Sequence, residues 1–442
     1  MLEILLVFSI IFFLISTLFL KTELFFFLYI LLNFFQDILI VSNENFSLEV
    51  MGTALYTNDF FFLAQILYSF QYLITNFLLK KNSKLSATQF WVLLLFLLTI
   101  LKIFYSYFIF GTLAFVTSRA ILYFLGNILF FSLGIMSPKR ILKFFQIIFF
   151  FSFIYLFVAL FRYLGLLPSL YYGIDFMVWE DDFSSNRLLD KDQLMFILFG
   201  SIFSLSSFYH QPGSFRKIYL LFFILFSLLI VFSNTRSIIL VYLLGMTYFL
   251  IVNNIFNIKF LFISIVTTIL LLGSISFFDI ALFETYFSGF TYENLFSENS
   301  TFFWRGLVSL GYLSNMTFAA YFIGMSFGNI PIIFVEQFTS MTGGTAGLHN
   351  FYVQIFYYYG LPITLMIFGF IMKIFIKMHS LTHLLDDDIK NIHIINMMIF
   401  QIFICYLAWP SHILEAIIIG LSICMFSHYE KIKDIRQLKI SK

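Results

Sequence analysis

Five of the eight arginines in this chain stand apart from the lysines. When the apolar segments are taken as membrane spans, these five fall on the side opposite most lysines: Arg119, Arg162, Arg187, Arg236 and Arg305. A guanidinium is a planar fork of donors that holds a phosphate with two hydrogen bonds, whereas an ammonium is a point charge. Such a group of arginines at the lipid boundary suggests an anionic, lipid-linked ligand such as a polyprenyl pyrophosphate.

The alternative is that these arginines only neutralise acidic residues on the same side. That explanation suffices for one arginine and explains less for five together. Three of the acids are consecutive and are also the set that could hold Mg²⁺, but consecutive acids in a loop are more often solvated, so we predict no metal and no cofactor. The acidic residues on this side are Glu180, Asp181, Asp182, Asp190, Glu284, Glu293 and Glu298.

His349 is the residue whose type and place suit proton transfer. It follows the glycine-rich stretch 342–348 and, with Asn350, begins the apolar segment 351–376. A helix N-terminus favours the neutral imidazole, which can accept a proton. The sequence therefore predicts a general base at His349. The alternative is a histidine that only satisfies a helix end, which is how we interpret His412.

The composition sets the class of protein in which these residues must work. Of 442 residues, 61% are hydrophobic, 22% aromatic and 11% charged, and the mean hydropathy is +0.97. Soluble chains carry about a quarter charged residues, so this composition excludes a soluble enzyme, a disordered chain and a nucleic-acid binder. Cys405 and Cys424 lie in apolar runs and suggest neither a disulfide framework nor a metal cluster.

The elements that must position the candidate residues are membrane helices. Apolar runs of about 17–25 residues span a bilayer as helices, whereas barrel strands are half as long. We therefore predict an all-α polytopic membrane protein with one membrane domain over 1–442, and a retained first helix rather than a signal peptide. Because the first two runs meet at the short stretch Lys21-Thr22-Glu23, the count is twelve or thirteen: 4–20, 23–41, 58–79, 88–108, 118–136, 141–164, 192–209, 217–233, 237–253, 259–278, 351–376, 391–409 and 412–428.

Lysines and arginines in the short turns orient these helices, because such residues favour the cytoplasmic side. The orientation places two long segments outside, 165–191 and 279–350, and the second is long enough to be functional. Within it, 301–322 is predicted to be a helix lying on the membrane surface. The prolines are predicted to lie in loops or near helix ends, so that no helix breaks at its middle. Lys102, the clearest charge inside a span, is expected to reach the interface.

Four short motifs resemble, in order and sidedness, those of the O-antigen ligase and Wzy-type O-antigen polymerase superfamily. Ser233-Asn234-Thr235-Arg236-Ser237 resembles its S-x-[ST]-R element, and His349-Asn350 followed by Gly360 resembles its H-N-x9-G element. Between them lie Phe303-Trp304-Arg305 and the Gly324/Gly328 pair, and upstream lies the stretch from Asn186 to Gln193. The family's second glycine after the H-N element is Ile363 here.

The resemblance implies a glycosyltransferase fold of the GT-C type in a bacterial inner membrane, with a metal-independent site facing the periplasm. Undecaprenyl-pyrophosphate-linked glycans would be donor and acceptor, and a chain-length regulator would be a protein partner. His349 would be the base, while Arg236 and Arg305 would stabilise the leaving pyrophosphate. The residues that would bind substrate are Arg187, Asn350, Arg119 and Arg162.

Three alternatives remain beside the favoured polymerase of O-antigen or related polysaccharide. A ligase would transfer the same glycan to lipid A-core. A flippase or transporter of lipid-linked oligosaccharide would need polar residues along the middle of the membrane, and the sequence places almost none there. A membrane scaffold would leave the outer arginines unexplained.

Overall fold

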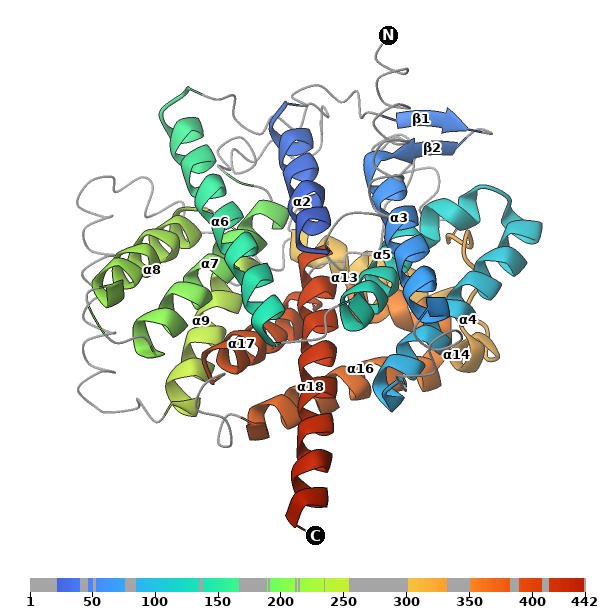
Figure 1. Cartoon of the computed structure of the whole chain (residues 1–442). Helices are drawn as coiled ribbons and strands as arrows, with labels where there is room; N and C mark the ends of the chain where they lie inside the picture. The colour runs from blue at the N-terminus through green and yellow to red at the C-terminus, as the bar shows by residue number, and fades with distance from the viewer. Residues whose placement is uncertain are drawn as a thin grey trace.

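The computed structural model describes residues 22–39, 47–50, 53–75, 85–134, 138–166, 189, 191–210, 213, 215–233, 235–253, 301–331, 350–381, 389–407 and 413–440. These residues form a bundle of helices with one small two-stranded hairpin (Figure 1). The expected helices at 4–20 and 259–278 lie outside the described residues, as do most of the two long segments 165–191 and 279–350.

The order of elements follows the expected apolar runs. Each of the other eleven predicted spans coincides with a helix. The elements are α2 (Thr22–Leu39), β1 (Ser47–Val50), β2 (Thr53–Tyr56), α3 (Thr57–Leu73), α4 (Ala87–Phe110), α5 (Leu113–Gly134), α6 (Pro138–Tyr163), α7 (Lys191–His210), α8 (Phe215–Phe232), α9 (Arg236–Val252), α13 (Thr301–Ser314), α14 (Ala320–Ile323), α16 (Phe351–Leu381), α17 (Ile389–Cys405) and α18 (Ile413–Ile440).

Length and apolar composition make the bundle a membrane protein. Among the described residues six helices are long and apolar enough to cross a bilayer: α4, α5, α6, α7, α8 and α16. The apolar parts of α3, α9, α17 and α18 are shorter, between 10 and 17 residues. A chain of this kind buries its backbone polar groups in helices because lipid offers them no partners.

Three local features depart from the expectations. The hairpin pairs Ser47 with Tyr56 and Val50 with Thr53, where no strand was predicted. The predicted surface helix 301–322 is two helices, since the chain turns between α13 and α14. The prediction that no helix breaks at its middle is wrong, because α16 has a non-helical residue at Gly360 and contains Pro362.

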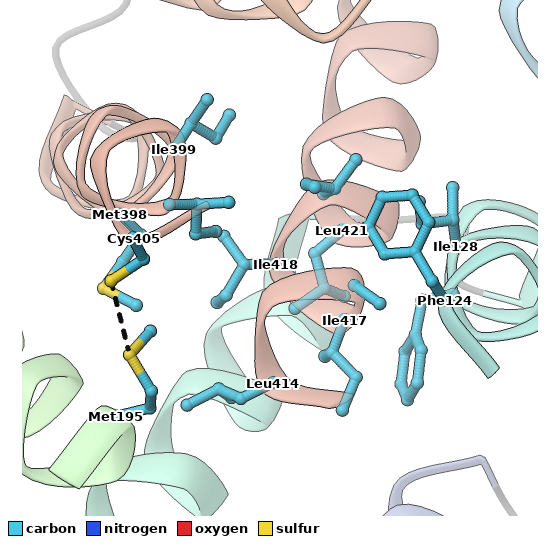
Figure 2. Packing of buried hydrophobic residues seen from close by; sticks show 14 of the residues in the cluster. Phe124, Ile128, Met195, Met398, Ile399, Cys405, Leu414, Ile417, Ile418 and Leu421 are labelled. Carbon is cyan, nitrogen blue, oxygen red and sulfur yellow. Dashed lines mark hydrogen bonds between the residues drawn. The ribbon is translucent and has the colours of Figure 1, made fainter. Parts of the chain in front are cut away.

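The core is built around α18, which runs through the bundle and projects beyond it at the C-terminus (Figure 1). Figure 2 shows its apolar side chains between α17 on one side and Phe124 and Ile128 of α5 on the other. A sulfur contact of 3.9 Å between Cys405 of α17 and Met195 joins α7 to the same cluster. Both cysteines are buried.

The contacts also fix which helix ends lie together. Ser86, which caps α4, contacts Ser427 near the end of the apolar part of α18 at 2.9 Å. Arg140 at the start of α6 lies 3.8 Å from Glu23 at the start of α2. Basic residues gather where α6 and α8 begin and where α16 ends. We call this the lysine-rich end: Arg140, Lys143, Arg216, Lys217, Lys373 and Lys377.

Candidate functional site

The motif-bearing helix ends meet at the opposite end of the bundle. The amide of Phe351 at the start of α16 donates to the Tyr406 carbonyl at the end of α17, at 3.1 Å. Helix α9 runs antiparallel to α17, because Val241 contacts Gln401 while Phe249, further along α9, contacts His393 near the start of α17. The start of α9, where the chain reaches Arg236, therefore lies at the same end as Asn350. We call it the Asn350 end.

The middle of α5 and the start of α7 lie beside this end as well, since Met195 of α7 contacts Cys405 at the end of α17. The ring of Phe124 in α5 lies 4.9 Å from that of Phe351. Arg162 at the end of α6 donates to Gln193 at the start of α7, at 3.0 Å. Gln193 closes the upstream motif from Asn186, so one predicted binding residue touches another motif directly.

Asn350 is the residue that begins α16. Its side-chain oxygen accepts a hydrogen bond from the Val353 amide at 3.1 Å, which is the arrangement of a helix N-cap. Its side-chain nitrogen donates to the Leu407 carbonyl at 3.0 Å. The predicted substrate-binding amide thus also fixes where α16 starts relative to α17.

Arg119 has an acidic partner that the sequence did not reveal. Its Nε lies 3.2 Å from the carboxylate of Asp59 at the start of α3. The hydroxyl of Tyr123, one turn further along α5, donates to the same carboxylate. Neutralisation by a carboxylate, the alternative considered for each arginine, is therefore present at Arg119, although the acid is not one of the loop residues expected.

The two predicted catalytic arginines lie on α9 and α13. Arg236 is the first residue of α9, and the buried Ser233 and Thr235 shape the turn before it. The Ser233 hydroxyl donates to the Ile230 carbonyl, and the Thr235 hydroxyl donates to the Ser233 carbonyl. Arg305 lies in α13, which packs against α16 through the rings of Tyr312 and Tyr357, 4.9 Å apart. His349 and Arg187 lie outside the described residues.

The glycines of two separate motifs come into backbone contact. Gly324 ends α14 with φ 73° and ψ 165°, and Gly360 breaks α16 with φ 73° and ψ 174°, a region open essentially to glycine alone. A Cβ built on Gly324 would lie 2.1 Å from the Tyr358 carbonyl oxygen, and one on Gly360 would lie 2.5 Å from the Phe322 carbonyl. The two motif glycines therefore let the two chain segments touch.

Lys102 of α4 lies at this contact between α14 and α16. The sequence had instead predicted that its side chain reaches the membrane–water interface. Its ammonium donates to the carbonyl of Ile323 at 3.0 Å and to the carbonyl of Tyr358. The ring of Tyr359 is 5.6 Å away, within reach of a cation–π contact. The signal that could have located it is Pro362, because a proline inside a helix removes the hydrogen bond to the residue four before it, here Tyr358.

A second buried ionisable group outside the predicted site residues is Glu415 in the first turn of α18. Its side chain is fully buried and lies beside the Tyr406 hydroxyl at the Asn350 end. In the described part of the chain, no three side chains of His, Cys, Asp or Glu come together as a metal site would require. The acids Glu180, Asp181 and Asp182 lie outside that part.

Comparison with models of known protein families gave no match. Comparison with curated proteins also gave none. The arrangement of the helix ends is therefore the basis on which a function can be argued.

Proposed function

We propose that this chain is a glycosyltransferase that polymerises undecaprenyl-pyrophosphate-linked repeat units, of O-antigen or a related surface polysaccharide, at the periplasmic face of a bacterial inner membrane. The proposal includes the finer topology of twelve or thirteen spans, with the Asn350 end facing the periplasm. It also keeps the resemblance to the O-antigen ligase and polymerase superfamily, whose motifs four short stretches of the sequence resemble in order.

The observation that carries the proposal is that two of these motifs, far apart in the chain, open helices that start at the same end of the bundle. The starts of α9 and α16 both lie beside the end of α17, and α13 packs on α16. Charged residues are costly to place in a membrane, so we attribute the motif arginines at these helix ends to function, whereas Arg119 is paired with Asp59. The lysines and arginines that orient the helices in the membrane lie at the lysine-rich end.

The chemistry needs three parts from this end. The attacking hydroxyl of the acceptor would give its proton to His349, and its oxygen would form the bond to the anomeric carbon of the growing chain. The bond between that carbon and the pyrophosphate oxygen would break, and the leaving undecaprenyl pyrophosphate would keep the electron pair. Arg236 and Arg305 would stabilise the charge that develops there, and Arg187 and Arg162 would hold substrate phosphate.

The test is complementation of a deletion strain with single variants. Arg236→Ala, Arg305→Ala and His349→Ala should each insert at wild-type level and abolish long glycan chains, since loss of one such charge costs on the order of 10²–10³ in rate. Arg216→Ala at the lysine-rich end is the matched control and should keep chain length. Wild-type chain length in all three variants would refute the proposal.

The deletion strain itself separates polymerase from ligase. A polymerase deletion should leave lipid A-core with a single repeat unit on a gel. Core without any repeat, together with accumulated lipid-linked polymer, would identify a ligase. The purified protein should work in EDTA, and a strict need for a divalent cation would refute the metal-independent mechanism.

The broken helix α16 is one observation that favours a second candidate, a flippase of lipid-linked oligosaccharide. Transporters build substrate and ion sites from such breaks inside the membrane. In this chain a lysine already lies on the freed carbonyls at the break, at the place where a transporter would bind its coupling cation. A flippase deletion should trap single lipid-linked units on the cytoplasmic face, which distinguishes it from both enzymes.

A further inference from the structure

The break in α16 leaves backbone carbonyls without their helical partners. Pro362 has no amide hydrogen to donate to Tyr358, and the turn at Gly360 also frees the carbonyl of Tyr357. The Tyr357 carbonyl is satisfied by the amide of Met325 at 2.7 Å. Ile323, the last residue of α14, likewise has a carbonyl beyond which the helix does not continue. Two helix ends thus direct partial negative charge at one place.

The ammonium of Lys102 supplies the missing donors and the opposite charge. It bonds the carbonyls of Ile323 and Tyr358, one from each helix end. Thr99, one turn earlier on α4, fixes the neighbouring ring through a 2.5 Å contact with the Tyr359 hydroxyl. Lysine partners of this kind complement the charge at helix C-termini. Among the described residues Lys102 has no carboxylate partner. The partial negative charges of these two carbonyls therefore stabilise its ammonium.

The same segment is held along the rest of α4 and the start of α5. The amide of Phe327 donates to the Ser106 hydroxyl at 3.0 Å, and that of Gly328 donates to the Thr117 hydroxyl at 2.7 Å. Lys102 lies eight residues before the end of α4 at Phe110, or about 12 Å along a helix. Side chains of α4 and α5 therefore satisfy irregular backbone that enters the bundle to that depth, as the membrane interior requires.

We infer that Lys102 is a positioning residue for the site at the Asn350 end, because its ammonium joins the end of α14 to the first half of α16. That half, residues 351–359, is about 13 Å long and has Asn350 at its far end. Its direction is fixed at one end by Asn350 on α17 and at the other by Lys102 on α4. The inference rests on the proposed function for its effect on turnover, and on geometry alone for the contact.

The test compares Lys102→Met, which keeps length but loses charge and donors, with Lys102→Arg, which keeps both. Lys373→Met on the exposed far part of α16 is the matched control. Amide hydrogen exchange of the purified full chain should rise in 320–328 and 351–360 for Lys102→Met, and remain unchanged in 236–252 and 413–428. Lys102→Arg and Lys373→Met should exchange as wild type does.

Turnover separates positioning from mere packing. Misplacing reacting groups by about 1 Å can cost on the order of 100-fold in rate, so Lys102→Met should lower kcat by that order and leave KM for the lipid-linked unit within about twofold. Lys102→Arg should recover most of the loss. Unchanged exchange in Lys102→Met, unchanged kcat, or an equal loss in Lys102→Arg would each overturn the inference. If the wild-type chain forms no polymer, the proposed function fails, and the exchange experiment still decides whether Lys102 holds the two segments.

Discussion

Two glycine contacts in this bundle differ in what they do to the backbone. At the α5–α18 contact, Gly420 lies within a continuous helix, and a Cβ there would meet the Phe131 side chain at 2.8 Å and the Ile128 carbonyl oxygen at 3.0 Å. At the α14–α16 contact, Gly324 and Gly360 adopt positive φ and interrupt their helices. The first contact brings two intact helices close together, whereas the second opens the backbone.

The two contacts differ in how their backbone polar groups are satisfied. Around Gly420 the neighbours are the Phe131 side chain and the Ile128 backbone, and Gly420 itself lies within α18. Around Gly360 the freed carbonyls need Lys102 and the Met325 amide, which come from distant parts of the chain. Strained glycines and broken helices concentrate at functional sites because packing alone gives no reason to keep them. We therefore predict that the α14–α16 contact serves the proposed activity and that the α5–α18 contact serves folding.

The largest effect is expected for Gly360→Ala, and Gly324→Ala should resemble it. Each adds a Cβ within about 2.5 Å of opposing backbone at a dihedral that only glycine adopts. The free energy of unfolding should fall by at least about 3 kcal/mol, and long glycan chains should disappear. Thermal unfolding in detergent and gel analysis of surface polysaccharide measure the two. Wild-type behaviour would mean that the segments do not touch.

Gly420→Ala should affect stability and spare activity. Overpacking of a rigid helix contact costs about 2 kcal/mol, and the neighbours here are a Cβ and backbone, which cannot rotate away. Unfolding temperature should fall, while chain length per folded molecule should match wild type. A loss of polymer from protein that remains folded would contradict the separation of the two contacts.

Asn350→Ala tests the outer end of the half-helix that Gly360 defines. The variant removes the N-cap bond to Val353 and the bond to Leu407, so the free energy of unfolding should fall by about 1 kcal/mol. Asn350→Asp keeps the cap oxygen and should retain most stability. If Asn350→Asp loses polymer while remaining as stable as wild type, the amide nitrogen serves substrate as well as structure.

Gly369→Ala is the smallest change and calibrates the others. This glycine lies in α16 beyond the break, and a Cβ there meets no atom within 4 Å. Alanine favours a helix over glycine by up to about 1 kcal/mol, so melting temperature should rise slightly and activity should be unchanged. A destabilising result would place an unseen neighbour against this face of α16.

Much of the helical framework could be predicted from local sequence. Apolar runs predicted eleven of the described helices because lipid selects length and hydropathy residue by residue. The start of α16 at Asn350 and the start of α9 at Arg236 also follow from the motifs at those positions. The positions of His349 and Arg187 remain predictions, as do the roles of Arg236, Arg305, Arg162 and Arg119.

What the sequence by itself determined is which segments are helices and which residue types stand at their ends. What only the tertiary structure decided is that Lys102 meets Ile323 and Tyr358, that Arg119 meets Asp59, and that two motif glycines touch. The physical reason is the distance along the chain over which each effect acts. Hydropathy acts on each residue where it stands, whereas an unpaired carbonyl or charge inside a membrane can be satisfied by any part of the chain that reaches it.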